Sequence, residues 1–230
     1  MDVQAHRGSP DPGSGILENT VDAFLRSARL GADGVELDVR LTRDGALAVH
    51  HDPAISGLGP VAELDVGQLP AHVPLLDAAL DACTGLAVNI EIKNLPHEAG
   101  FDPEEHAALA VCALVAELST PDSILISSFW PASLDAAMAC GPEIRTGLLV
   151  PSWFDAGEAL ELAIEHGFGA LHPEMSVITA DLVTSVHRAG LAVAARTVNQ
   201  PAELRTALEW GVDTVITDEV ASALALVGAT

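Results

Sequence analysis

Three acidic side chains occupy alternate positions in two stretches of apolar sequence. Glu36 and Asp38 lie in GVELDV (34–39), and Glu91 lies in LAVNIEIK (86–93). Residues two apart in a strand point to the same side, so each stretch presents its polar residues in one direction. Carboxylates buried together repel one another, and a divalent cation relieves that repulsion; an all-oxygen ligand set suits Mg²⁺ or Ca²⁺ better than Zn²⁺. We therefore predict a metal site here, the alternative being that one or two of the three pair with arginines at the rim of the fold.

Two histidines are candidates for proton transfer. His6 ends a short apolar run, and His51 ends ALAVHH (46–51). A single histidine is more often structural, but two imidazoles at strand ends beside three carboxylates can act as general base and general acid on a metal-bound phosphate. We predict these roles for His6 and His51. His50 should point to the opposite side and be structural, and His172 is a weaker candidate for lining the site.

Lys93 is the one lysine in the chain, and the other nine basic residues are arginines. It follows Glu91 by two residues, so the two side chains share one face of the same predicted strand. A compact cation beside a metal site suits a phosphate oxygen. The alternative is a salt bridge from Lys93 to Glu91 or to another carboxylate.

These residues need a scaffold that brings the ends of separate strands together. Short strand-like runs alternate with longer helical patterns over the whole length, which indicates a parallel sheet covered by helices. Helices are predicted over 18–31, 155–167, 179–190 and 200–211, because each stretch ends in glycine. The predicted strands are 3–6, 34–39, 46–51, 86–93, 123–129, 145–150, 170–173, 191–198 and 213–217.

One of these nine runs does not fit a parallel sheet. Only RLTRDG separates the run 46–51 from the strand before it, which is too short for a parallel crossover, and Asp44-Gly45 is a strong hairpin signal. This run should fold back antiparallel, and the other eight should close a TIM (β/α)8 barrel, whose functional groups gather at the carboxyl ends of the strands. We expect a single domain over 1–230, with 52–74 as an irregular loop. A doubly wound open sheet is the alternative, but no G-x-G-x-x-G follows the first strand.

The composition excludes several classes of protein. Hydrophobic residues make up 49% of 230 residues, enough for a sizeable core. The formal net charge is −23, which argues against a nucleic-acid partner and against a basic membrane-binding patch, because both need clustered Lys and Arg. Such an acidic surface favours solubility or tolerance of high salt. An anionic small-molecule substrate would therefore need a local positive centre.

Targeting signals are missing from the sequence as given. The N-terminus, MDVQAHRGSPDP, has neither the basic nor the apolar region of a secretory signal, and no window approaches the ~20 apolar residues of a membrane helix. Cys83, Cys112 and Cys140 are widely spaced in helix-like segments, and we expect them to be small buried residues in a reducing compartment. The expectation is a cytoplasmic protein with no stable membrane insertion, and nothing in the sequence sets an oligomeric state.

Short motifs follow one another in a definite order across nearly the whole chain. They are AHRG (5–8), ENT (18–20), GVELDV (34–39), LTRDG (41–45), VHHD (49–52), EIK (91–93), SSF (127–129), RTVN (196–199) and VITD (215–218). Each motif alone is a weak signal, but the ordered set is very specific. In order and spacing it resembles the glycerophosphodiester phosphodiesterase family.

The resemblance implies a TIM barrel that hydrolyses glycerophosphodiesters to an alcohol and glycerol 3-phosphate with the help of a divalent cation. Carried over residue by residue, Glu36, Asp38 and Glu91 match the metal ligands of the family. His6 and His51 match its catalytic pair. The attacking oxygen could come from water, or from the neighbouring glycerol hydroxyl with a cyclic phosphate formed first.

The resemblance also implies substrate contacts. Arg7 and Lys93 match the phosphate-binding cations, and Glu18 and Asn19 match an EN motif near the site. One position departs from the family, which usually has Trp before TVN where this chain has Arg196. If Arg196 lines the mouth of the barrel, it could bind a second anionic group; otherwise it could pair with an acidic neighbour and face away from substrate.

Two rival functions remain open at this point. A related barrel phosphodiesterase acting on lysophospholipids would need apolar surface at the mouth, for which FWP (129–131) and SWF (152–154) are candidates, although ordinary packing explains them more simply. A non-catalytic barrel that binds an anionic metabolite would be expected to lack a histidine or a carboxylate, yet all are present.

Overall fold

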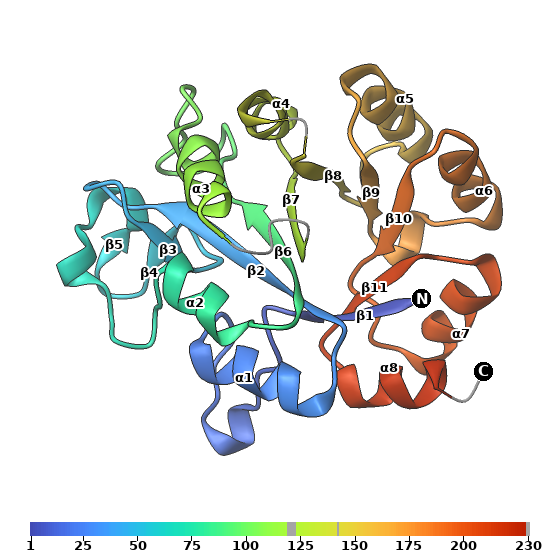
Figure 1. The fold of residues 1–230 in the computed structure, drawn as a ribbon, viewed down its shortest axis with the longest axis horizontal. Coiled ribbons are helices and arrows are strands. Elements are labelled where there is room, and N and C mark those ends of the chain that lie inside the picture. The colour runs from blue at the N-terminus through green and yellow to red at the C-terminus, as the bar shows by residue number, and fades with distance from the viewer. Residues whose placement is uncertain (119–122, 142, 229–230) are drawn as a thin grey trace.

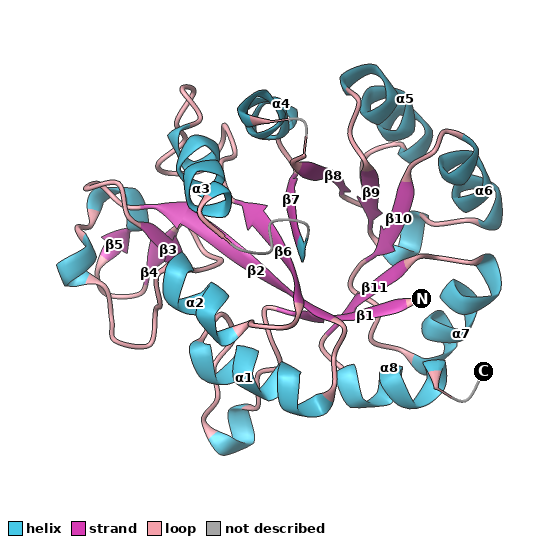
Figure 2. Ribbon diagram, viewed as in Figure 1, coloured by secondary structure: helices cyan, strands magenta, loops and turns pink. Residues whose placement is uncertain are grey.

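The computed structural model describes residues 1–118, 123–141 and 143–228, in which a ring of strands is surrounded by helices (Figures 1 and 2). Each strand of the ring runs parallel to its neighbours, and β1 closes the ring by pairing with both β11 and β2. The architecture is the predicted TIM barrel. Its eight strands are β1 (Asp2–His6), β2 (Gly34–Leu41), β6 (Ala87–Ile92), β7 (Ile124–Ser128), β8 (Arg145–Val150), β9 (Ala170–Pro173), β10 (Ala192–Ala195) and β11 (Thr214–Thr217).

The predicted antiparallel excursion is β3 (Leu47–Val49), which pairs with the carboxyl-terminal part of β2. The turn between them has Gly45 at φ 84°, a left-handed conformation that glycine adopts without steric cost. The strand ends at Val49, two residues earlier than predicted. The next residue still donates its backbone N–H to the carbonyl oxygen of Asp38 at 3.0 Å, so the pairing direction continues to the start of the following loop.

Helices follow the strands and cover the outside of the ring. The first of them begins at Thr20, whose hydroxyl oxygen accepts a hydrogen bond from the N–H of Ala23, and ends at Gly31 with φ 84°, as the sequence predicts. The helices are α1 (Val21–Leu30), α2 (Leu76–Ala82), α3 (His106–Ala116), α4 (Pro131–Cys140), α5 (Ala156–His166), α6 (Ala180–Arg188), α7 (Pro201–Trp210) and α8 (Val220–Val227).

The segment 52–74 is more ordered than the irregular loop expected from its Pro and Gly content. It contains a two-stranded hairpin, β4 (Ala54–Ile55) with β5 (Gly59–Pro60), and two short 3₁₀ turns. A small hydrophobic cluster of its own packs it against β3, and its members are Ala48, Ile55, Val61, Leu64 and Val73.

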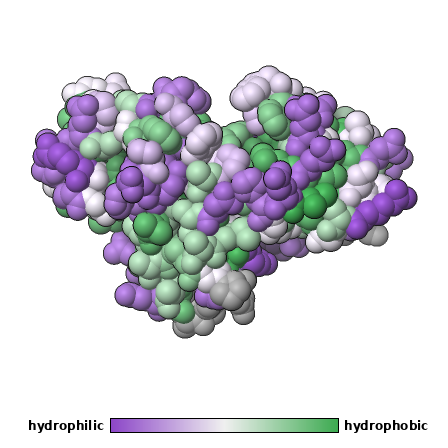
Figure 3. Space-filling view, turned by 90° about the horizontal axis from the view of Figure 1, so that it is seen from above, coloured by the Kyte–Doolittle hydropathy of each residue, from purple (hydrophilic) through white to green (hydrophobic). Residues whose placement is uncertain are grey.

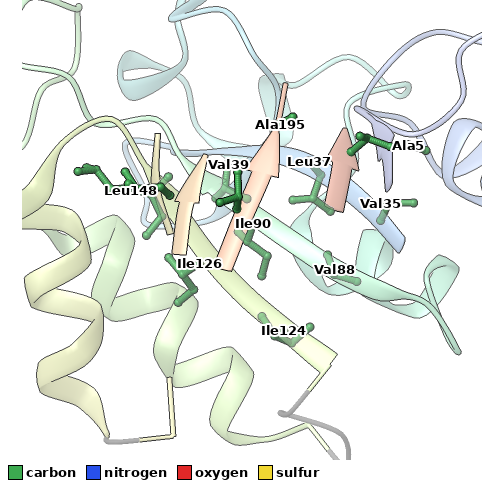
Figure 4. Close-up of a cluster of buried hydrophobic side chains, with 14 of the residues drawn as sticks. Ala5, Val35, Leu37, Val39, Val88, Ile90, Ile124, Ile126, Leu148 and Ala195 are labelled. Carbon is green, nitrogen blue, oxygen red and sulfur yellow. The ribbon is translucent and has the colours of Figure 1, made fainter. Parts of the chain in front are cut away.

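The strands divide their side chains between two environments. In β2, Val35, Leu37 and Val39 are fully buried in the large cluster between barrel and helices (Figure 4), while Glu36 and Asp38 between them face the other way, into the barrel. Burying each apolar side chain of this size contributes about 1.5–3 kcal/mol. Burial of the apolar residues against the helices therefore places the polar residues that alternate with them in the barrel interior.

The cysteines differ in one respect from the expectation. Cys83 and Cys112 are buried, but Cys140 is exposed, because it ends α4 on the side turned to solvent. Exposed apolar and hydrophilic residues are interspersed on the face seen in Figure 3. None of the helices within the described residues is both long and apolar enough to cross a bilayer.

Candidate active site

The three predicted carboxylates meet at the carboxyl ends of two neighbouring strands. Glu36 and Asp38 project from β2 and Glu91 from β6, where Asp38 lies directly opposite Glu91 in the parallel pairing. One oxygen from each of the three residues lies within 4.8 Å of the others, and all three side chains are buried. The structure thus brings together the whole predicted ligand set.

The donor set fits a hard divalent cation. Glu36 Oε1 and Asp38 Oδ1 are buried and have no hydrogen-bond partner among the described residues. Burial, and after it the charge of Asp38, raises the pKa of Glu36 to about 8. Burial acts in the same sense on Asp38, but the charges of Lys93 and Arg7 outweigh it and lower that pKa. Carboxylate oxygens left without donors are the ligands that Mg²⁺ and Ca²⁺ take.

Two cations border the acidic cluster. Lys93 Nζ lies 2.7 Å from Glu91 Oε1 and 3.6 Å from Asp38 Oδ1, so the salt bridge considered as an alternative for this lysine is present. Burial lowers the pKa of Lys93, but Glu91 and Asp38 raise it more, and the ammonium stays charged. Arg7 Nε lies 3.4 Å from Asp38 Oδ2, and its Nη1 donates to Glu18 Oε1 at 2.8 Å. Both cations therefore lie directly against the carboxylate cluster.

The loop after β1 holds the carboxylates of β2 in place. Asn19 is buried; its Nδ2 donates to Asp38 Oδ2 at 2.8 Å, and its Oδ1 accepts from the Asp38 N–H at 3.2 Å. The backbone N–H of Arg7 donates to Glu36 Oε2 at 3.0 Å. Glu18, in contrast, is exposed and touches the site through Arg7. The EN motif thus contributes one residue that orients a carboxylate and one that orients a cation.

His6 is paired with a carboxylate that the sequence did not single out. Its Nδ1 lies 2.8 Å from Asp218 Oδ1, and Asn199 Nδ2 donates to the other oxygen of Asp218 at 2.6 Å. An ionised carboxylate can only accept hydrogen bonds, so His6 Nδ1–H is the donor. In the neutral ring, the other nitrogen, Nε2, then has no proton and is able to accept one. Burial lowers the pKa of His6, but the hydrogen bond to Asp218 and the charge of Glu36 raise it more, and the net shift is upward.

His51 has a carboxylate of its own and a backbone anchor. Its Nδ1 lies 2.8 Å from Asp52 Oδ1, and its carbonyl oxygen accepts from Arg40 Nε at 2.8 Å and Nη2 at 2.6 Å. The buried Arg40 also donates from Nη1 to Glu98 at 2.8 Å. Arg40 therefore ties the segment that carries His51 to the loop after β6.

Both histidines are placed by the same edge of β2. In β1, His6 stands opposite Glu36, and beyond that point β3 takes over the pairing, with Val49 opposite Val39. The chain then reaches His51 two residues later. The two imidazoles therefore border the same acidic cluster from successive positions along one strand.

Three further candidates occupy different environments. Burial lowers the pKa of His50, whose buried Nε2 has no hydrogen-bond partner among the described residues. His172 is inside the barrel, where its ring lies against Gly147, and burial and the charge of Arg196 lower its pKa to about 3. Arg196 follows β10, and its guanidinium carbon lies 4.5 Å from the centre of the Phe129 ring.

An apolar cavity of about 670 Å³ opens beside the charged site. Phe129 links the two, because its ring lines the cavity and lies 5.8 Å from Lys93 Nζ. Both aromatic motifs noted in the sequence contribute to its walls. The residues that line the cavity are Leu95, Pro96, His97, Phe129, Trp130, Pro131, Leu148, Leu149, Pro151, Trp153, Phe154, Ala159 and Leu162.

A parallel barrel with carboxylates, imidazoles and cations at the carboxyl ends of its strands is the framework of a barrel hydrolase that acts on phosphate esters. The chain belongs to the glycerophosphoryl diester phosphodiesterase family, whose model matches residues 6–222. It is therefore an enzyme that hydrolyses phosphoric diesters of the glycerophosphodiester kind.

Individual relatives align with this chain over almost their full length. The glycerophosphodiester phosphodiesterase of Caldanaerobacter subterraneus subsp. tengcongensis is 29% identical in an alignment 249 residues long, and the alignment covers 98% of this chain and 97% of that protein. The solved glycerophosphodiester phosphodiesterase of Thermotoga maritima is 25% identical, with a TM-score of 0.80 and 98% of each chain covered. A phosphodiesterase of Oleispira antarctica, solved in complex with its product sn-glycerol-3-phosphate, is 24% identical; its TM-score of 0.85 over 99% of this chain and 97% of that one shows the same fold.

Proposed function

We propose that the protein hydrolyses glycerophosphodiesters to an alcohol and glycerol 3-phosphate, with a divalent cation bound by Glu36, Asp38 and Glu91. The observation that carries the proposal is the buried carboxylate cluster, whose oxygens lie within 4.8 Å of one another and are bordered by Lys93 and Arg7. When bound, the cation supplies positive charge for the phosphate oxygens and for the charge that develops on them. The substrate is a small molecule, and the sn-glycerol-3-phosphate named in the Oleispira antarctica structure is the product expected here.

The side chains of this protein then have separate tasks. Lys93 and Arg7 bind the phosphoryl oxygens, and Glu18 and Asn19 hold Arg7 and Asp38 in position. One of the two imidazoles, His6 or His51, takes the proton from the attacking oxygen as its bond to phosphorus forms. The other gives a proton to the alcohol oxygen as its bond to phosphorus breaks.

The direct test is turnover after removal and return of the metal. The protein is treated with EDTA, dialysed, and assayed with glycerophosphoglycerol in buffer alone and with added Mg²⁺ or Ca²⁺, while glycerol 3-phosphate is measured enzymatically. We expect activity to vanish with EDTA and return with one of the two cations. Full turnover by protein verified to be metal-free would remove the metal from the proposal.

A second candidate function is favoured by the apolar cavity. Its walls and its position next to Phe129 and Lys93 fit the acyl chain of a lysophospholipid whose phosphate is bound at the charged site. Trp153 is 83% exposed, so replacing it removes cavity wall with little effect on folding. With this function, Trp153→Ser lowers choline release from lysophosphatidylcholine and leaves release from glycerophosphocholine unchanged. Equal effects on the two substrates would count against it.

A further inference from the structure

Arg196 is a half-buried cation without an acidic partner in the described part of the chain. Its Nε donates to the carbonyl oxygen of His172 at 3.3 Å, and its Nη2 is buried with no hydrogen-bond partner among the described residues. Burying a charged donor without an acceptor is unfavourable by an amount comparable to a lost hydrogen bond or more. Nη2 is itself out of reach of a ligand, but Arg196 is only half-buried, so an acceptor from outside the protein that meets the accessible part of its side chain would balance the charge.

The other arginines do not share this combination. Those that are buried or half-buried have carboxylate partners: Arg7 with Glu18 and Asp38, Arg26 with Asp11, and Arg40 with Glu98. The arginines outside any ion pair in the described ranges, apart from Arg196, are exposed to water, and they are Arg29, Arg145, Arg188 and Arg205. In a protein with net charge −23, acidic partners are abundant, so a half-buried guanidinium without one is a departure from the rest of the chain.

The guanidinium of Arg196 is held in one place by its surroundings. It lies over the Phe129 ring at 4.5 Å, a cation–π contact, and its Nε is held by the backbone next to it. Lys93 Nζ lies 5.8 Å from the centre of the same ring, so the two cations contact one aromatic side chain. His172 adds no charge, because burial and the charge of Arg196 keep its pKa far below neutrality.

We propose that Arg196 binds a carboxylate on the alcohol half of the substrate, which rests on the function proposed above. The glycerol half of a glycerophosphodiester carries hydroxyl groups only, so a second negative charge must lie on the alcohol. One guanidinium balances one carboxylate, whereas a phosphate monoester would leave excess negative charge in an already acidic protein. The substrate class is therefore glycerophosphodiesters whose alcohol carries a carboxylate, such as the serine ester.

The test compares two substrates that differ by the carboxylate alone. Glycerophosphoserine and glycerophosphoethanolamine are assayed with the wild-type protein, Arg196→Gln and Arg196→Lys, and the ratio of their kcat/KM values is determined. We expect the wild type to favour the serine ester by about 10- to 100-fold, because a charge-assisted hydrogen bond is lost with the other substrate. The ratio should fall to about one in Arg196→Gln and recover in part in Arg196→Lys. Arg205→Gln, an exposed arginine on α7, should keep the wild-type ratio.

A general effect on folding changes both kcat/KM values equally and cancels in their ratio. The ratio therefore reports recognition of the carboxylate. A wild-type ratio of one or less, or an unchanged ratio in Arg196→Gln, overturns the proposal. If neither ester is cleaved, turnover of glycerophosphoglycerol decides about the proposed function, and calorimetry decides about Arg196 separately. Phosphoserine should then bind the wild type more tightly than phosphoethanolamine does, and equal affinities would overturn the role of Arg196.

Discussion

Each histidine of the site has a carboxylate at 2.8 Å from its Nδ1, Asp218 for His6 and Asp52 for His51. Such a partner fixes the tautomer and stabilises the imidazolium that forms when Nε2 takes up a proton. In the mechanism that we propose, the acid and the base are therefore two similar units, and their roles depend on which side of the phosphorus each one faces.

The first prediction concerns these imidazoles. We expect His6→Ala and His51→Ala each to lower kcat by about 10²- to 10⁴-fold, because each removes one proton transfer. The measurement is steady-state turnover of glycerophosphoglycerol with saturating metal, with circular dichroism to verify folding. His72→Ala, in an exposed loop position, is the control and should retain full activity. Near-normal kcat in a folded His6 or His51 variant would exclude that residue from proton transfer.

The second prediction concerns the pH dependence of the rate. Asp218 raises the pKa of His6, so Asp218→Asn should lower it, and the limb of the pH–rate profile that His6 controls should move to lower pH. The direction is the same whether His6 acts as acid or as base, since both limbs follow its pKa. Asp135→Asn provides the control, because Asp135 pairs with His166 at 2.8 Å on the surface between α4 and α5. An unchanged profile in Asp218→Asn would contradict the coupling.

At the scale of elements, the site depends on the parallel pairing of β2 with β6, which sets Asp38 opposite Glu91. The apolar residues of these strands are buried against the helices. Because successive side chains of a strand point to opposite faces, the polar residues between them face the barrel interior. The same register that forms the core therefore forms the carboxylate cluster.

The third prediction is that the cation stabilises the fold. A ligand that binds only the native state raises stability in proportion to the logarithm of its concentration, so a hundredfold excess over Kd should raise Tm by about 5–10 °C for a chain of this size. Glu36→Gln should abolish most of that shift. Because the pKa of Glu36 is raised to about 8, a proton competes with the cation, and the shift should be larger at pH 8 than at pH 6. Thermal unfolding with and without Mg²⁺ or Ca²⁺ measures it; no shift at either pH would contradict the site.

The fourth prediction concerns the start of α1, which follows directly after the site residue Asn19. Thr20→Ala removes the acceptor for the Ala23 N–H and should lower the free energy of unfolding by about 0.5–2 kcal/mol. Urea denaturation gives the value. Thr184→Ala, an exposed mid-helix position in α6, serves as the control and should change it by less than about 0.5 kcal/mol. Equal losses in both variants would argue against a specific cap.

The four helices predicted from the sequence were identified by the glycine that ends each stretch, and in the structure all four also begin with a capping side chain. Thr20, Asp155 and Thr179 cap α1, α5 and α6, and a capping box with Gln200 begins α7. In contrast, α2, α3, α4 and α8 begin at residues whose side chains make no capping hydrogen bond, and no ranges were predicted for them. Of these, α4 has a local start signal in Pro131 at its first position, whereas α2, α3 and α8 depend more on packing against the barrel.

The site was predicted where its signal is local and missed where it is not. Glu36 and Asp38, and likewise Glu91 and Lys93, are two apart in a strand, and this spacing predicted that each pair shares one face. Asp218 lies 212 residues from its partner His6, and Arg40 reaches Glu98 across 58 positions, so no spacing rule links them. Asp218 ends the VITD motif (215–218) at a strand end, but nothing in the sequence assigns it to His6.

At the scale of the whole molecule, the barrel carries a net charge of −23 and must nevertheless bind an anion. We propose that residues 1–230 form one domain, because a single hydrophobic cluster includes residues from all eight strands of the ring. The charges of the surface then act together on any approaching substrate, and they oppose the local attraction of Lys93 and Arg7.

The fifth prediction follows from that opposition. Raising the ionic strength from ~10 mM to ~150 mM shortens the Debye length from about 30 Å to about 8 Å and screens the surface more than the buried site. KM for glycerophosphoglycerol, which has a net negative charge, should therefore fall several-fold, with the divalent cation kept saturating. Glycerophosphocholine, with no net charge, is the matched control and should respond little. A rise in KM with salt for the anionic substrate would show that steering is attractive.

The shared edge of β2 has a consequence for which parts of this protein can change. Because β1 and β3 occupy successive parts of that edge, the backbone ladder sets how far His6 lies from the chain that leads to His51. The hairpin-containing segment 52–74 has its own small core, and it begins after the pairing with β2 has ended at His50. Grafting a longer or shorter loop between β4 and β5 would change the outside of this segment while the ladder, and Asp52 beside His51, stay as they are.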